Sequence, residues 1–170
     1  MIYNGKEQKQ EVKAFDTATG KELTSADVVI TYSSDLTNVG TVTVTVAATE
    51  NGNYSGSFIR TYNITPAPLT IVTESASKEY DGKALTADGS VDGFVNGETA
   101  TFKATGSQTN VGESDNTYSL TWDGTAQKSN YEIVSETLGK LTVTKATLPE
   151  DPDDPEDPKD NRFRQLFLKM

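Results

Sequence analysis

The 170-residue sequence contains no histidine and no cysteine, and it has a single tryptophan. Without histidine or cysteine, the chain lacks the base and the thiol of the common nucleophilic sites, and it lacks the ligands of zinc and iron–sulfur centres. Disulfide bonds are excluded as well. Catalysis would have to rest on a pair of carboxylates in a cleft, and no stretch of the sequence indicates one. We therefore expect no enzyme activity, no catalytic residues, no cofactor and no metal site.

Positive charge is scarce, with 15 Lys and Arg against 25 Asp and Glu, a net charge of −10. Contact with phosphate backbones requires a concentrated basic face, so we expect no nucleic-acid partner. No apolar run is long enough to cross a bilayer, so we expect no membrane insertion. Much of the acidity lies in the segment PEDPDDPEDPKD at residues 149–160. Regularly spaced prolines among like charges predict an extended, acidic, Pro-rich spacer at residues 148–160. The basic and apolar residues 161–170 form a tail that is either the start of a further module or a vector-derived end.

Two halves of the chain share one order of short motifs. The Tyr-Asn-Gly-Lys motif at residues 3–6 recurs as Tyr-Asp-Gly-Lys at residues 80–83, and Thr-Asn-Val-Gly at residues 37–40 recurs at residues 109–112. Asn53-Tyr54 matches Asn130-Tyr131. The closing segment at residues 62–67 matches residues 141–146. These four landmarks in the same order indicate an internal repeat. The sequence therefore predicts two modules, at residues 1–66 and 67–147.

Apolar residues alternate with polar ones throughout both modules, which is typical of half-buried strands. Asn-Gly and Asp-Gly pairs between the alternating runs indicate tight turns. We expect an all-β fold of two small antiparallel Ig-like β-sandwich modules, with a small barrel as the alternative. Pro66 and Pro68 form a short proline-containing linker that restricts bending between the modules. The predicted core consists of Val28, Ile30, Val42, Val44, Val46, Tyr54, Phe58 and Ile64 in the first module, and Leu85, Phe94, Phe102, Leu120, Trp122, Tyr131, Ile133, Leu141 and Val143 in the second.

The motif order Y-[ND]-G-K, T-N-V-G, N-Y and a closing strand ending in T-P-A or T-K-A resembles the MBG-type repeats. These are Ig-like, β-rich modules of bacterial cell-surface proteins. The resemblance covers nearly all of residues 2–146. It implies an extracellular location on a bacterial cell surface or cell wall, and a non-enzymatic structural or adhesive role as stalk or spacer repeats of an adhesin.

Trp122 is the one residue that offers a ligand platform in the sequence. A single tryptophan in the run Tyr-Ser-Leu-Thr-Trp is more often a core residue, but aromatic faces also stack on ligands. The alternative function is therefore a carbohydrate- or mucin-binding module that uses the aromatic residues of the second module. The expected partners are host or cell-surface glycans and proteins, contacted through a longer parent protein, and the chain is expected to be a monomer.

Overall fold

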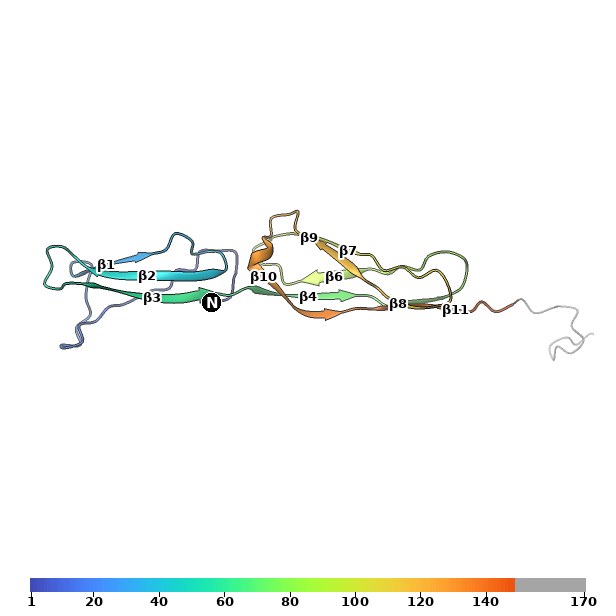
Figure 1. Cartoon of the computed structure of the whole chain (residues 1–170), viewed down its shortest axis with the longest axis horizontal. Coiled ribbons are helices and arrows are strands. Elements are labelled where there is room, and N and C mark those ends of the chain that lie inside the picture. Colours follow the sequence, from blue (N-terminus) through green and yellow to red (C-terminus); the bar gives the residue numbers. More distant parts are fainter. Residues whose placement is uncertain (149–170) are drawn as a thin grey trace, which may run out of the picture.

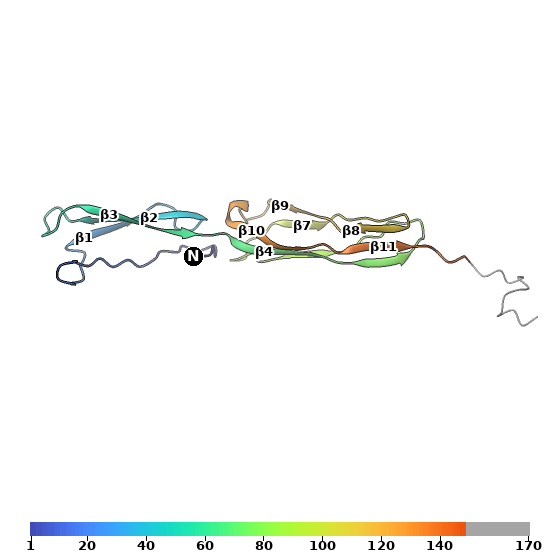
Figure 2. The same cartoon turned by 60° about the horizontal axis from the view of Figure 1, so that its bottom comes forward.

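The computed structural model describes residues 1–148 and shows an elongated, all-β molecule whose two halves lie end to end (Figure 1). Figure 2 shows the same arrangement from a second side. Residues 1–148 contain no α-helix, and their single 3₁₀ turn is too short to cross a membrane. The predicted spacer, apart from Leu148, and the predicted tail at residues 161–170 lie outside the described residues.

The first half contains one antiparallel sheet with the strand order β1-β2-β3. The strands are β1 (Val28–Tyr32), β2 (Gly40–Ala48) and β3 (Ser57–Ile64). Strict alternation in β2 places Val42, Val44 and Val46 on one face, where each is 1 % exposed. Valine favours strands because its branched side chain packs well on a pleated surface. This valine row forms the centre of the first half.

The second half contains three small sheets, with the orders β10-β4-β6, β5-β11-β8 and β7-β9. A short 3₁₀ turn, η1 (Lys128–Asn130), leads directly into β10. The strands are β4 (Ala67–Thr73), β5 (Ala76–Glu79), β6 (Gly89–Asp92), β7 (Thr101–Ala104), β8 (Gly112–Asp115), β9 (Tyr118–Thr121), β10 (Tyr131–Thr137) and β11 (Lys140–Thr144).

The prediction of purely antiparallel sheets is wrong for two strand pairs. β4 runs parallel to β10, from the pair Ala67–Tyr131, and β5 runs parallel to β11, from the pair Ala76–Leu141. Alternation of apolar and polar residues reports which side chains share a face, but it carries no information on the direction of the neighbouring strand. The all-β class is confirmed, and the sheets are of mixed direction.

The internal repeat extends to individual hydrogen bonds. The amide of Tyr3 donates to the carbonyl of Thr65 at 2.8 Å, and the amide of Tyr80 donates to that of Thr144 at 2.9 Å. In the turns that follow, the Lys6 amide donates to Asn4 Oδ1 at 3.0 Å and the Lys83 amide to Asp81 Oδ1 at 2.9 Å. In both halves, therefore, the Y-x-G-K motif binds the last strand through equivalent backbone groups.

The two halves are joined by only two residues, Thr65 and Pro66, between the end of β3 and the start of β4. Side chains from the second half bind back across this joint. Asn130 accepts from the Val39 amide at 3.0 Å and donates to Asn38 at 2.8 Å. One cluster of buried residues spans both halves and comprises Tyr3, Val42, Ile64, Ala67, Leu69, Ala126 and Tyr131. The halves therefore share a core at the joint.

Eight of the seventeen predicted core residues are buried. Buried members include Val28, Val42, Val44, Val46, Ile64, Tyr131, Leu141 and Val143. Phe58 and Ile133 are wrong, because they are 44 % and 42 % exposed. The other predicted members are partly buried. The prediction also missed Tyr3, Ala67, Leu69 and Ile71, each at most 4 % exposed.

Candidate functional site

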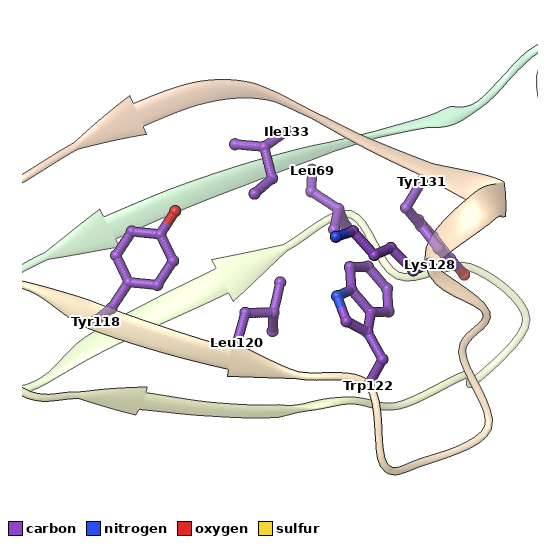
Figure 3. A pocket seen from close by; sticks show the side chains of 7 residues that line it. All are labelled: Leu69, Tyr118, Leu120, Trp122, Lys128, Tyr131 and Ile133. Atoms are coloured by element: carbon purple, nitrogen blue, oxygen red, sulfur yellow. The ribbon is translucent and has the colours of Figure 1, made fainter.

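A cleft opens in the second half where two strands that correspond to a pair in the first half have separated. In the first half, β2 and β3 pair over eight positions, from Gly40–Ile64 to Ala47–Ser57. In the second half, the equivalent strands divide: β8 pairs with β11, while β9 pairs with β7 and β10 pairs with β4. The space between β9 and β10 is a cleft of about 350 Å³ (Figure 3). It is lined by Leu69, Tyr118, Leu120, Trp122, Lys128, Tyr131 and Ile133.

Aromatic side chains form much of the cleft wall. Tyr118, Leu120 and Trp122 lie two residues apart, so the extended chain of β9 presents them on one face. The Trp122 ring stacks on the Tyr131 ring with centroids 5.8 Å apart and an interplanar angle of 30°. Phe94 contacts the Trp122 ring edge to face at 5.9 Å. Trp122 is partly buried, so it belongs both to the core and to the cleft.

Among the described residues, Lys128 is the one charged residue that lines the cleft. In Figure 3 its side chain extends from η1 over the cleft. It forms no salt bridge with any residue from 1 to 148. An ammonium group without a protein partner is available to an anionic group of a ligand.

Burial raises the pKa of both tyrosines in the cleft, Tyr118 and Tyr131. Burial is the main cause that raises the pKa of Tyr131 to about 12, and the hydrogen bond to Glu98 adds to it. Burial also raises the pKa of Tyr118, with a smaller contribution from Glu136. Both phenols are therefore neutral at physiological pH, and they offer ring faces and hydroxyl groups but no base.

The cleft has the chemistry of a binding site for a flat, apolar group. Its walls are aromatic and aliphatic, its one charge is positive, and its volume lies at the lower end of the range typical of ligand pockets. Among residues 1–148, no carboxylate lines the cleft, and no group of Asp or Glu side chains is arranged to hold a metal ion. Nothing in the cleft pairs a nucleophile with a base.

The sequence identified some of these residues. Trp122, the one predicted platform residue, does line the cleft, and so do Leu120, Tyr131 and Ile133, which were expected in the core. Sequence reasoning missed Tyr118, Lys128 and Leu69. The spacing of Tyr118, Leu120 and Trp122 was the available signal, since period two places all three on one face.

A model of the YDG domain matches residues 65–138, which is less than half of the chain. The match covers β4 to β10 and therefore the whole lining of the cleft. No curated protein and no solved structure matches the chain.

This match corrects the expectations that rested on the resemblance to MBG-type repeats. The family assignment is wrong for residues 65–138, because the model that matches there is the YDG domain. The roles as adhesive stalk, spacer or glycan-binding module of a cell-wall protein are overturned with it, as are the glycan and surface-protein partners. The exclusion of nucleic acid is overturned too, because the YDG name is used for a type of domain that binds methylated DNA.

Proposed function

We propose that residues 65–138 form a non-enzymatic binding domain whose aromatic cleft takes a single planar ring. The observation that carries the proposal is the stack of Tyr131 and Trp122 beside the ammonium of Lys128, which forms no salt bridge within residues 1–148. An aromatic wall binds a planar ring by stacking and by removing its apolar faces from water, and each stacked base contributes about 1–3 kcal/mol.

The class of ligand to test first is a nucleobase, because DNA carrying methylcytosine is the ligand of domains that share the YDG name. A cleft of this size can take a base only when that base is outside the stack, and a 5-methyl group adds apolar surface to a cytosine ring. Leu69, Leu120 and Ile133 supply apolar contacts of the kind that such a methyl group would use.

Surface charge limits how much of a nucleic acid this domain can contact. Residues 65–138 contain four lysines and no arginine against eleven Asp and Glu, a net charge of −7. A long duplex would meet mostly acidic surface, which opposes phosphate contact. The proposal is therefore restricted to an unstacked base with one phosphate at Lys128, and the affinity is expected to depend only weakly on salt.

Trp122 provides a direct readout because it is the only tryptophan in the chain. Its fluorescence is to be measured during titration with 5-methylcytidine monophosphate and with short single-stranded oligonucleotides that carry either methylated or unmethylated cytosine. We expect saturable quenching, stronger for the methylated probes. Lys128→Ala should weaken the binding of the phosphorylated probes, whereas Lys103→Ala, on β7 and outside the cleft lining, should not. Absence of any saturable change at about millimolar probe would overturn the proposal, since stacking and the contact of Lys128 with a phosphate should together give measurable occupancy there.

We also propose that the two halves are Ig-like modules built on one plan. The equivalent bonds of Tyr3 to Thr65 and of Tyr80 to Thr144 support this proposal. A solved structure in which residues 1–66 and 67–147 superpose strand for strand is the test, and a different connection of the strands would contradict it. The extracellular location was implied by the MBG resemblance alone, so it stays a prediction, to be tested by fractionating the cells that produce the protein.

A further inference from the structure

The second half contains one strand, β4, whose counterpart is missing from the first half. In the second half, β10 has β4 beside it as a parallel partner. β4 places four side chains in the core, since Ala67, Leu69 and Ile71 are fully buried and Thr73 is 3 % exposed. In this half, therefore, β4 completes the core.

The first half has no strand at the corresponding place. Residues 54–60 lie 77 positions before residues 131–137, the offset that relates Tyr54 to Tyr131. β3 pairs with β2 on one edge. On its other edge, Thr65 bridges in parallel to Ile2, as β11 pairs in parallel with β5. No strand of residues 1–148 pairs with that edge from Ser57 to Thr61.

The burial of side chains changes along β3 accordingly. Phe58 lies opposite the buried Val46 and Ile64 lies opposite Gly40, on the face that carries the valine row. Ile64, next to residues 1–3, is 2 % exposed, whereas Phe58 is 44 % exposed. Arg60, on the same face, is exposed and lies over the Phe58 ring at 5.1 Å. The core face of β3 is therefore uncovered where a partner strand is missing.

A hollow lies beside this uncovered face. It has a volume of about 260 Å³, and its lining is mostly apolar, with Leu23, Val28, Val46, Tyr54 and Phe58 among the contributors. In the second half, the matching positions are Tyr118, Leu120, Tyr131 and Ile133, which line the aromatic cleft, and β4 contributes Leu69 to that lining. A strand of the same kind beside β3 would bring an aliphatic side chain to this hollow.

We propose that the free edge of β3, at residues 57–61, is an acceptor for a parallel β-strand supplied by another polypeptide. The occupant has the chemistry of β4: an extended segment that begins with proline and carries alternating aliphatic residues. Backbone hydrogen bonds to β3 provide its affinity, and the two inward aliphatic side chains provide its specificity, as in other complexes formed by strand addition. This site is separate from the aromatic cleft and does not depend on the ligand proposed there.

The test uses the full chain and a synthetic peptide of residues 66–77, PAPLTIVTESAS. Amide hydrogen exchange is measured for residues 57–61 with and without the peptide. For a dissociation constant of about 0.1 mM, 1 mM peptide is expected to slow the edge amides about tenfold. A control peptide with Leu69→Asp and Ile71→Asp should leave the rates unchanged, and Phe58→Asp in the protein should abolish the effect of the natural peptide.

A second arm raises the local concentration of the strand. The same twelve residues are fused to the N-terminus, so that Met1 follows the segment as Lys78 follows it in the second half. We expect protection of residues 57–61 and a rise in melting temperature of about 4–8 °C, relative to a fusion that carries both Asp substitutions. Protection in the fusion alone supports an acceptor site of lower affinity. Unchanged exchange with both the peptide and the fusion overturns the proposal, as does equal protection by the Asp control.

Discussion

The hydroxyl of Tyr3 donates a hydrogen bond to Oε1 of Glu98, 95 positions later in the chain. The other oxygen of that carboxylate accepts from the hydroxyl of Tyr131 at 2.8 Å. The two tyrosine rings contact each other edge to face, with centroids 5.6 Å apart. One carboxylate therefore holds the first residues of the chain and the first residue of β10 in a fixed relation, across the joint between the halves.

Replacing Glu98 with alanine should destabilise the protein. The substitution leaves the buried hydroxyls of Tyr3 and Tyr131 without their acceptor, and an unsatisfied buried polar group costs about 1–3 kcal/mol. Urea unfolding measures the loss, and Glu132→Ala, an exposed position on β10, is the matched control. A loss no greater than that of the control would show that Glu98 does not contribute to the joint.

Gly5→Ala should cost more stability than Gly20→Ala, although the two glycines have nearly the same φ, +71° and +70°. Both alanines carry the strain of a left-handed backbone, about 1–2 kcal/mol. At Gly5 the new Cβ would also lie 2.5 Å from Cβ of Asn96, whose amide donates to the Gly5 carbonyl at 3.0 Å. At Gly20 no atom lies within 4 Å. The difference between the thermal midpoints of the two variants measures the cost of the close contact between residue 5 and Asn96. Equal midpoints would contradict the predicted extra cost at Gly5.

Stability should fall as the pH rises from about 10 towards 12. Burial raises the pKa of Tyr131 from 10.0 to about 12 and raises that of Tyr3 as well. Above pH 10 the unfolded chain loses these phenolic protons while the folded chain keeps them, so unfolding becomes more favourable with each step in pH. Below pH 10 both states are protonated and the contribution is complete. The free energy of unfolding, measured by urea titration from pH 9 to 11.5, should decline less steeply in Tyr131→Phe, and a parallel decline would contradict this assignment.

Asn116→Ala should be among the most damaging single substitutions in the second half. Asn116 is fully buried, and its Nδ2 donates to the carbonyls of Glu74, Ala87 and Asp88 at 3.0 to 3.2 Å. Removing the amide takes one donor from each of these carbonyls, of which only that of Asp88 keeps another within residues 1–148, the Glu74 amide at 2.8 Å. The expected loss is about 3 kcal/mol. Chemical denaturation is the measurement, and Asn110→Ala, an exposed asparagine, is the control. Comparable midpoints for the two variants would show that the Asn116 network is dispensable.

The sequence predicted the all-β class correctly, because the alternation that forms strands is a local pattern, whereas the division into two repeated modules stays a prediction. The valine row of β2 and the turn at each Y-x-G-K motif follow from alternation and from glycine at positive φ, which Gly5 and Gly82 adopt. The matched motifs also marked equivalent strand positions, since Gly40 begins β2 and Gly112 begins β8.

The sequence did not reveal which strand faces are buried, because burial of a face depends on strands that are distant in the sequence. Phe58 and Ile133 share the alternation of their buried neighbours, yet each lies where an adjacent strand is absent or has moved away. Lys128 lines the cleft because β9 and β10 do not pair with each other. No local sequence pattern indicates that separation. Asn130 binds across the joint to Asn38, 92 positions earlier, a contact that no spacing rule predicts.

The parallel pair of β4 and β10 has a consequence for how the chain folds. Ala67 and its partner Tyr131 are 64 positions apart, so β4 emerges from the ribosome long before β10 exists. Pairing between distant segments is slow, and apolar strands that wait for their partners are prone to incorrect association. The nearest strand with a free edge during that interval is β3, which only two residues separate from β4. Pro66, between them, favours an extended backbone and so opposes the tight reversal that would fold β4 back onto β3. Pro66, one of the two residues of the joint, therefore also opposes incorrect pairing of β4 with β3 in the nascent chain.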